Sequence, residues 1–413
     1  MKQPARRLYL DNAATSFPKP DAVVRAMVGY ATGNGASPRG RFAEAREAGA
    51  LLTRCRDGIN RLINGESADH VVFTLNTTDA LNLAIKGSLG SAAAGYHGVR
   101  VGVGGAGYHV VTTWLDHNSV LRPVAAMVGR DLGQTRIEAN GDTAVIHPAA
   151  VAAAVTSKTM LVVINHASNV TGAIQPVKEI VAAVRERAQT MSVPFGTPLV
   201  LLDAAQSMGH IPVDVRELDV DLVAFPGHKG LLGPTGTGGL YIRPGVEKRL
   251  ANVREGGTGT GSESEAQPTV MPDRFESGSH NTIGIAGLGA GVAWLLERGM
   301  DFVREHELRL INVMLEGVRG ARGLRLLGPE EPERRVGVFS FVHDEICPAD
   351  MAAILESQFG ILCRAGLHCA PLAHESMGTA PPLGQGAVRL SIGPFTRDDG
   401  VRFAAAALRE ICG

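Results

Sequence analysis

The chain of 413 residues contains a series of short apolar segments that lack the polar–apolar alternation of half-exposed strands. Each segment is rich in β-branched residues or Leu, and small or polar residues follow it. Strands of this kind are expected in a sheet that helices cover on both faces. Six candidates fall between residues 71 and 242: Val71–Leu75, Val110–Thr113, Met160–Ile164, Leu199–Leu202, Leu222–Phe225 and Gly239–Ile242.

Longer segments with helical patterns separate these candidate strands. Ala149–Val155 and Val177–Ala188 are predicted to be helices that cover the sheet. A third helix is predicted over Asp79–Lys86, with Thr77 or Thr78 as its N-cap. The alternation of strands and helices predicts a mainly parallel α/β sheet.

The last third of the chain has a different pattern. The stretch Arg254–Pro272 is dense in Gly, Ser, Thr, Glu and Pro, and is either a disordered linker or a functional loop. After it we predict helices over Thr282–Leu296, Phe302–Val318, Ala349–Phe359 and Arg397–Ile411, and strands over Val336–Val342, Gly360–Arg364 and Ala387–Ile392. We therefore place a domain change near residue 270.

Charge and cysteine content exclude several classes of protein. The 40 Lys and Arg against 41 Asp and Glu give a net charge of −1, without the basic surplus expected of a protein that binds nucleic acid or an anionic membrane. No run of 18 uncharged apolar residues exists, so we expect no membrane span and a cytoplasmic location. The five Cys are odd in number and lack a CxxC pair, which argues against a disulfide framework or a metal site.

Two charged residues, Asp203 and Lys229, each come shortly after a predicted strand. Asp203 ends the apolar run Leu199–Leu202, and it is either a partner for a cationic group, such as a pyridinium nitrogen, or a helix N-cap. Lys229 follows Leu222–Phe225, and it is either a surface charge or a buried amine that can form a Schiff base. The pair lies one βα unit apart, which favours the chemical interpretation of both residues.

Other polar residues stand at similar positions. Asn169 follows Met160–Ile164, where it can donate to a phenolate oxygen or simply belong to a turn. Thr77 and Thr78 lie where a strand leads into a helix N-terminus, which suits a phosphate as well as a cap. The literal GxGxxG match at Gly102–Gly107 precedes a strand instead of opening a helix, so we reject a dinucleotide site there.

A turn near the C-terminal end contains a candidate reactive thiol. Cys369 lies among Gly, His and Pro residues, and Arg364 and His368 are close enough in sequence to favour its thiolate. The alternative is that Cys369 is an ordinary small apolar residue, which is our interpretation of Cys363. Arg389 lies inside an apolar strand, where a buried guanidinium is expected to bind a planar anion such as a substrate carboxylate.

Taken in order, these segments resemble the cysteine desulfurase and selenocysteine lyase family. This family belongs to the class V aminotransferases, which are fold-type I enzymes dependent on pyridoxal 5'-phosphate (PLP). The resemblance covers nearly the whole chain. It is carried by six motifs: Tyr9-Leu-Asp-Asn-Ala-Ala-Thr, Asp116-His117-Asn-Ser-Val, Ser168-Asn169-Val-Thr-Gly, Asp203-Ala-Ala-Gln206, Gly227-His228-Lys229-Gly and Arg364-Ala-Gly-Leu-His368-Cys369-Ala-Pro-Leu.

The resemblance implies a role for each matching residue around the cofactor ring. Lys229 would bind PLP covalently and act in catalysis, and Asp203 would pair with the pyridinium nitrogen. His117 would stack on the ring as a further catalytic residue. Asn169 and Gln206 would form hydrogen bonds near the phenolic oxygen.

The resemblance also implies how the cofactor phosphate is held. Thr77, Thr78 and His228 would bind it, and Ser279 would reach the phosphate of a second subunit, which implies a homodimer with shared active sites. Pro226 stands where the family often carries a hydroxyl residue, so one phosphate donor would be missing.

For the substrate, the resemblance implies that Arg389, with Asn169 and Arg364, binds an amino acid carboxylate, and that Cys369 accepts sulfur as the nucleophile. The expected architecture is a large PLP domain over residues 20–270. A small α+β domain would be made of residues 1–19 and 271–413 and would carry the Cys369 loop.

The function expected from the resemblance is conversion of L-cysteine to L-alanine with a persulfide on Cys369, for sulfur mobilisation such as iron–sulfur cluster assembly. Only 20 positions separate Cys369 from Arg389, as in the compact-loop branch, which favours an acceptor protein that reaches into the site. Leu367 replaces a polar residue common in that branch. The alternatives are a selenocysteine lyase, another class V reaction such as transamination or epimerisation, and a degenerate scaffold for sulfur transfer.

Overall fold

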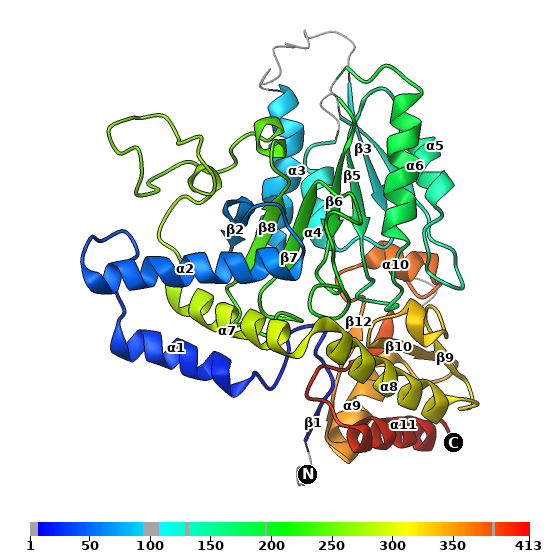
Figure 1. Ribbon diagram of the computed structural model, residues 1–413. Coiled ribbons are helices and arrows are strands. Elements are labelled where there is room, and N and C mark those ends of the chain that lie inside the picture. Colours follow the sequence, from blue (N-terminus) through cyan, green and yellow to red (C-terminus); the bar gives the residue numbers. More distant parts are fainter. Residues whose placement is uncertain (1–6, 94–106, 129–131, 195, 382–384) are drawn as a thin grey trace.

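The computed structural model describes residues 7–93, 107–128, 132–194, 196–381 and 385–413. Most of the Gly102–Gly107 segment lies outside these residues. The described chain forms a large, mainly parallel sheet flanked by helices and a smaller α+β part beside it (Figure 1), which confirms the predicted fold class.

The large sheet has seven strands among the described residues. Their spatial order is β2 (Val71–Thr74), β8 (Gly238–Ile242), β7 (Leu222–Pro226), β6 (Leu199–Asp203), β5 (Thr159–Asn165), β3 (Tyr108–Thr113) and β4 (Leu132–Ile137). The pairs from β7 to β4 are parallel, whereas β8 runs antiparallel to both of its neighbours. Parallel strands point their carboxyl ends toward one edge, where ligands bind in open α/β sheets.

Helices cover both faces of this sheet, as the apolar strands require. Along β5, Val162 and Ile164 belong to one core, while Leu161 and Val163 belong to the core on the opposite face. The first core is closed by α2 (Ala43–Leu62), α5 (Pro148–Ala154), α6 (Val177–Gln189) and α7 (Thr282–Arg298), and the second by α3 (Thr77–Ala93) and α4 (Asn118–Ala125). The remaining N-terminal helix, α1 (Asp21–Gly33), packs on α7.

The smaller part combines both ends of the chain. Its antiparallel sheet has the order β12 (Arg364–Gly366), β13 (Ala387–Ser391), β10 (Val338–His343) and β9 (Leu324–Leu326). The helices that share its core are α8 (Met300–Val318), α9 (Pro348–Phe359) and α11 (Asp398–Cys412), whereas Ala373 of α10 (Pro371–Ser376) belongs to the core of the large sheet. The N-terminal strand β1 (Leu8–Tyr9) pairs in parallel with β11 (Ile361–Leu362). The proposed boundary near residue 270 stays a prediction.

Local details differ from the sequence expectations in two places. Thr77 and Thr78 belong to the first turn of α3, and the cap is Asn76, whose Oδ1 accepts a hydrogen bond from the backbone N of Asp79 at 3.0 Å. The predicted strand Gly360–Arg364 is divided at Cys363 between β11 and β12, which belong to different sheets.

Candidate active site

The carboxyl ends of the central strands and the N-terminus of α3 surround a cavity of about 220 Å³. Residues from five separate segments line it, and they include eight that the sequence singled out: Thr77, Thr78, His117, Asn169, Asp203, Gln206, His228 and Lys229. Asp203 ends β6 and Lys229 follows β7, which is the next strand in the sheet. The sheet topology therefore brings the predicted pair to one edge.

Asp203 and Lys229 have opposite charges in a poorly solvated site. The Asp203 side chain is buried, and its Oδ1 accepts a hydrogen bond from the backbone N of Ala205 at 3.0 Å. Burial raises the pKa of Asp203, although Ala205 and Lys229 oppose that shift. Burial also lowers the pKa of Lys229, and the positive charge of Arg389 acts in the same direction. Each residue is therefore less firmly charged than it would be in water.

Backbone packing fixes the position of Lys229. A Cβ added at Gly209 would lie 2.3 Å from the carbonyl carbon of Gly230, so two glycines are needed where this turn crosses the lysine segment. Gly209 has φ of +82°, a conformation that favours glycine. The residue before Lys229 is held as well, because Lys19 Nζ donates to the His228 carbonyl oxygen at 2.8 Å.

His117 caps α4 and keeps a neutral ring. Its Nδ1 accepts a hydrogen bond from the backbone N of Ser119 at 3.0 Å, which leaves Nε2 to carry the proton. The pKa of His117 is lowered to about 4, first by burial and then by the charge of Lys229. The Ser119 hydroxyl lies 2.7 Å from Thr78 Oγ1 and so links the histidine to the first turn of α3.

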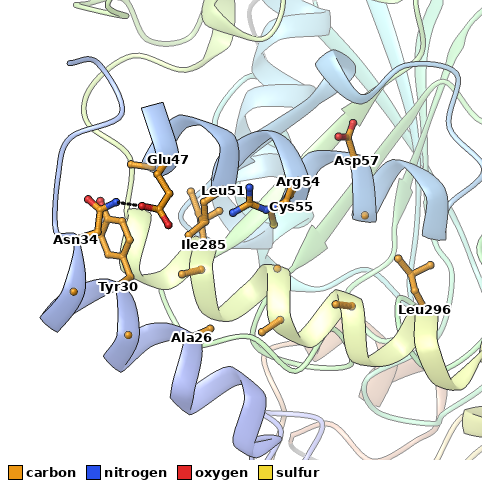
Figure 2. A pocket seen from close by; sticks show the side chains of 18 of the residues that line it. Ala26, Tyr30, Asn34, Glu47, Leu51, Arg54, Cys55, Asp57, Ile285 and Leu296 are labelled. Atoms are coloured by element: carbon orange, nitrogen blue, oxygen red, sulfur yellow. Dashed lines mark hydrogen bonds between the residues drawn. The ribbon is translucent and has the colours of Figure 1, made fainter. Parts of the chain in front are cut away.

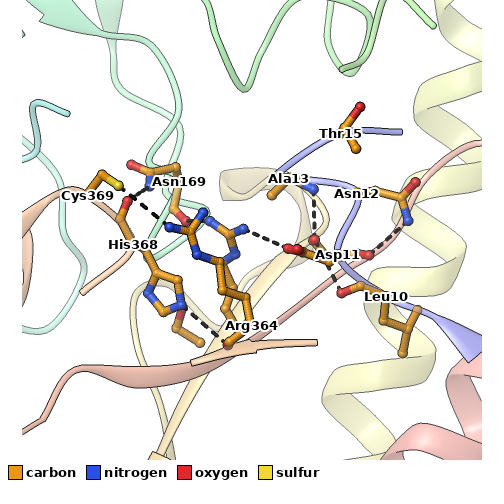
Figure 3. A network of polar contacts seen from close by, with 12 residues as sticks. Leu10, Asp11, Asn12, Ala13, Thr15, Asn169, Arg364, His368 and Cys369 are labelled. Atoms are coloured by element: carbon orange, nitrogen blue, oxygen red, sulfur yellow. Dashed lines mark hydrogen bonds and ion pairs between the residues drawn. The ribbon is translucent and has the colours of Figure 1, made fainter. Parts of the chain in front are cut away.

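Cys369, which Figure 3 labels next to His368, lies in a tight turn before α10. Its side chain is solvent-exposed. His368 and Cys369 both have positive φ, +52° and +59°. Two hydrogen bonds to backbone carbonyl oxygens hold the turn. Asn169 Nδ2 donates to the carbonyl oxygen of His368 at 2.8 Å, and the backbone N of Asn118 donates to the carbonyl oxygen of Cys369 at 2.8 Å. The thiol is thereby tied to the loop of Asn169 and to the start of α4.

The two residues proposed to assist the thiol behave differently. Arg364 Nη2 lies 3.6 Å from Cys369 Sγ, within reach of a hydrogen bond to sulfur. His368, by contrast, is buried, with its ring stacked on that of His374. Burial and the charge of Arg389 lower the pKa of His368 to about 2, so its ring is neutral. The buried His368 ring therefore places no positive charge beside the Cys369 thiol.

Arg389 is buried and already has hydrogen-bond partners. Its Nη2 donates to Asp11 Oδ1 at 2.8 Å and its Nη1 donates to the Asn169 carbonyl oxygen at 3.1 Å. Its Nε has no hydrogen-bond partner among the described residues. The guanidinium therefore lies at the Asn169 side of the site and retains free donors.

Ser279 lies apart from the other predicted residues. It is exposed and lines two shallow hollows that do not include Asp203 or Lys229. Its proposed contact with a second subunit stays a prediction. Arg39 holds the neighbouring backbone, because its Nη2 donates to the carbonyl oxygen of Gly257 at 2.9 Å and to that of Gly278.

A larger hollow of about 830 Å³ lies between α1, α2 and α7 (Figure 2). Small residues such as Ala26 and Gly289 form much of its wall, and Glu47, Arg54 and Asp57 lie at its sides. None of the predicted site residues lines this hollow.

Sequence reasoning missed several residues of the site. Asn76, Ser119 and Asn165 line the cavity. Asp11 lies in a motif that carried the family resemblance, but its side chain had no assigned role. A polar residue directly after an apolar strand was the available signal for Asn165, which ends β5.

The fold and this cavity define an α/β enzyme whose reacting groups lie at the carboxyl edge of the sheet. The family described as Aminotransferase class-V matches residues 8–403. The chain belongs to this family. In the described part of the chain, no helix is long and apolar enough to cross a membrane, and no group of three potential metal ligands is found.

Several similar proteins are named as cysteine desulfurases. The chain is 33% identical to a probable cysteine desulfurase of Methanothermobacter thermautotrophicus, over 98% of this chain and 95% of that protein. It is 33% identical to a cysteine desulfurase of Yersinia pestis, over 88% and 84% of the two chains. The apo structure of a cysteine desulfurase from Thermococcus onnurineus superposes with a TM-score of 0.85, at 29% identity, over 98% and 94% of the two chains.

Proposed function

We propose that this protein is a PLP-dependent cysteine desulfurase. The observation that carries the proposal is the cavity that Asp203 and Lys229 line, together with the turn that carries the exposed Cys369 thiol. The backbone of that turn is held by Asn169, which also lines the cavity, and by the backbone N of Asn118. Relatives named as cysteine desulfurases match over nearly the full length of the chain and support the same function.

The residues of the cavity fit PLP. Buried acceptors and donors there lack protein partners in the described structure, among them Asn165 Oδ1, Asn169 Oδ1 and His228 Nδ1. Asp203 is a buried carboxylate whose charge a protonated ring nitrogen would stabilise. Thr77 and Thr78 at the first turn of α3, with His228, suit a phosphate, because helix N-termini present unpaired N–H groups.

When bound, PLP supplies an electron sink that stabilises negative charge at the substrate Cα. Arg389 would bind the substrate carboxylate through its unused donors. Lys229, whose pKa is lowered by burial, would remove the Cα proton as a neutral amine. Asp203 would keep the ring nitrogen protonated through its buried carboxylate.

Cys369 would accept the sulfur. Its thiolate attacks the substrate sulfur, an S–S bond forms and the substrate C–S bond breaks. The electron pair of that bond stays on the carbon fragment, which is protonated and leaves as L-alanine. Cys369 then carries a persulfide for an acceptor protein. Arg364 would orient the thiol at 3.6 Å.

The remaining features of the proposal follow from the family resemblance. We propose a cytoplasmic homodimer in which Ser279 contributes to the partner's phosphate site. Its exposure on this chain agrees with such a role. We also propose that the sulfur acceptor is a protein that approaches Cys369, because the tight turn restricts how far the thiol can move.

The test is product analysis of the purified protein with L-cysteine. Equal amounts of alanine and sulfide, in the presence of a reductant, are expected, and mass spectrometry after borohydride reduction should place the cofactor on Lys229. The Cys369→Ala variant should keep the cofactor but lose sulfide release. Alanine without sulfide, or no turnover by a cofactor-loaded protein, contradicts the proposal.

Cys363→Ala is the matched control. Burial raises the pKa of Cys363 to about 12, so this thiol stays protonated and its loss should leave turnover unchanged. If Cys369→Ala keeps selenide release from L-selenocysteine while it loses sulfide release, the protein is better described as a selenocysteine lyase.

A further inference from the structure

The two peptide groups on either side of Lys229 are both held by the N-terminal segment of residues 15–19. The carbonyl oxygen of His228 accepts hydrogen bonds from the backbone N of Ser16 at 3.1 Å and from Lys19 Nζ at 2.8 Å. The carbonyl oxygen of Lys229 accepts a hydrogen bond from Ser16 Oγ at 2.9 Å. Because peptide groups are planar, holding both of them fixes the backbone dihedral angles of Lys229. The direction in which its side chain leaves the backbone is thereby set.

Lys19 supports both of these peptide groups. Its Nζ donates to Ser16 Oγ at 2.7 Å as well as to the carbonyl oxygen of His228. The Ser16 hydroxyl has one proton, and its oxygen lies 2.9 Å from the Lys229 carbonyl oxygen and 3.2 Å from that of His228. The shorter distance favours donation to Lys229. One ammonium group therefore holds the first peptide group directly and the second through Ser16.

The Lys19 ammonium group is partly buried and has no counter-charge to explain its position. Burial lowers the pKa of Lys19 to about 8, and no carboxylate of the described residues opposes this shift. Ser16, to which it donates, is buried. Lys19 is not among the described residues that line the cavity of Asp203 and Lys229. It therefore acts on the reacting lysine through the backbone and not by touching the cofactor.

The segment that carries these donors is itself fixed to the small sheet. Asn12 Nδ2 donates to the Ser391 carbonyl oxygen at 3.1 Å, and the backbone N of Ala13 donates to Ser391 Oγ at 2.8 Å. Asn12 Oδ1 accepts a hydrogen bond from the backbone N of Phe17 at 3.2 Å, which closes the turn between them. The donors to the lysine segment therefore come from a chain that is already held by β13.

We propose that Lys19 is a positioning residue for Lys229, which directs the lysine amine to the carbon of PLP with which it bonds. This inference rests on the proposed function, in which Lys229 binds PLP covalently. The amine nitrogen bonds to the aldehyde carbon, and the aldehyde oxygen leaves as water. A displaced lysine backbone would move the amine away from that carbon. The ring and the phosphate have other partners, so their binding does not depend on Lys19.

The test compares PLP with pyridoxamine 5'-phosphate, which has the same ring and phosphate but carries an amine in place of the aldehyde. It therefore cannot bond to Lys229. The full-length protein is loaded with either compound, and the rate of its dissociation is followed by absorbance after gel filtration. For Lys19→Met, which keeps an unbranched side chain and removes the donors, we expect PLP to dissociate about tenfold faster. The rate for pyridoxamine 5'-phosphate should change by less than about threefold.

Three further variants control this result. Lys19→Arg keeps a charged donor and should restore most of the PLP retention that Lys19→Met loses. Ser16→Ala removes the hydroxyl that contacts the Lys229 carbonyl oxygen, so it should also release PLP selectively. It makes the same comparison if Lys19→Met does not fold. Lys178→Met removes an exposed lysine paired with Glu217 at 3.1 Å and should behave as the wild type.

An unchanged rate of PLP loss from Lys19→Met and Ser16→Ala would overturn the inference. Equal acceleration for the two compounds would do so as well, since it would mean that Lys19 supports the phosphate contact or the fold in general. Dissociation is measured without turnover. A protein that fails to release sulfide from L-cysteine would therefore refute the proposed function but still give a result for Lys19.

Discussion

Arg364 Nη2 lies 3.6 Å from Cys369 Sγ, and it is the cation that contacts this thiol in the described structure. The neighbouring His368 is neutral and turned into the core. Any orientation of the thiol by a charged side chain therefore depends on Arg364.

The first prediction concerns this contact. Arg364→Ala should slow sulfide release from L-cysteine about tenfold, because a hydrogen bond to a charged group contributes about 1.5–3 kcal/mol and this one is only partly buried. Steady-state sulfide release measures the effect. Arg397→Ala, which removes an arginine with an 85% exposed side chain, is the control. Equal rates in Arg364→Ala and the wild type would exclude the role.

The second prediction concerns the buried histidine pair. His368 Nδ1 lies 3.3 Å from His374 Nε2, and His374 Nδ1 lies 2.8 Å from Thr379 Oγ1. Burial lowers the pKa of His374 to about 4, below the ~6.5 of an unfolded chain. Between these two values the unfolded state binds more protons, so stability is full above pH 6.5 and falls as the pH drops toward 4.

Urea unfolding at pH 7 and pH 5 tests this dependence. His374 should account for about 2 kcal/mol of the loss between these two values, because the unfolded chain is largely protonated at pH 5 while the folded one is not. His374→Asn should therefore lose about 2 kcal/mol less than the wild type over the same interval. A variant with the wild-type pH dependence would show that His374 is not held neutral by the fold.

Much of the fold and the centre of the site could be predicted from the sequence, because their signals are local. Asp203 and Lys229 each follow an apolar strand directly, and parallel strands carry such residues to one edge. The orientation of His368 and the partner of Arg389 could not be predicted. Asp11 lies 378 positions from Arg389, and they meet only through the packing of the N-terminal segment against β13.

The third prediction concerns a buried acid next to the lysine segment. Glu307 accepts hydrogen bonds from His210 Nδ1 at 2.9 Å, Arg304 Nη1 at 2.8 Å and the backbone N of Gly337 at 2.9 Å. The charges of His210 and Arg304 hold the pKa of Glu307 below its usual value despite burial. Its stabilising contribution is therefore present at neutral pH and is lost as the pH falls through that lowered pKa.

Glu307→Gln should destabilise the fold by about 3 kcal/mol, because it removes the buried carboxylate that accepts hydrogen bonds from Arg304 and His210. Since His210 adjoins the Gly209–Gly230 crossing, the change should also weaken cofactor retention on Lys229. Urea unfolding and cofactor absorbance measure the two effects. Glu305→Gln, an exposed acid on the same helix, should show neither of them. If the variant loses stability but retains the cofactor normally, Glu307 does not influence the position of the lysine segment.

The fourth prediction concerns the loop that carries Asn169. Three side chains of the smaller part donate hydrogen bonds to the backbone carbonyl oxygens of three successive residues in this loop. Arg389 Nη1 donates to that of Asn169 at 3.1 Å, Ser340 Oγ to that of Val170 at 2.6 Å, and Arg335 Nη2 to that of Thr171 at 3.1 Å. Arg335 is fully buried and also donates to Pro329 and Val338. Its planar fork is therefore needed to satisfy three carbonyl oxygens at once.

Arg335→Lys should cost about 2 kcal/mol, because an ammonium group cannot reach all three acceptors, and Ser340→Ala should cost about 1 kcal/mol. Both donors hold one loop, so we expect the double variant to deviate from additivity by at least about 0.5 kcal/mol. Urea unfolding of the four proteins measures this coupling.

The loop also positions Asn169, which holds the carbonyl oxygen of His368 next to Cys369. Sulfide release should therefore fall in each variant in parallel with its stability, and additive free energies with normal turnover would mean that the two donors act independently of the site.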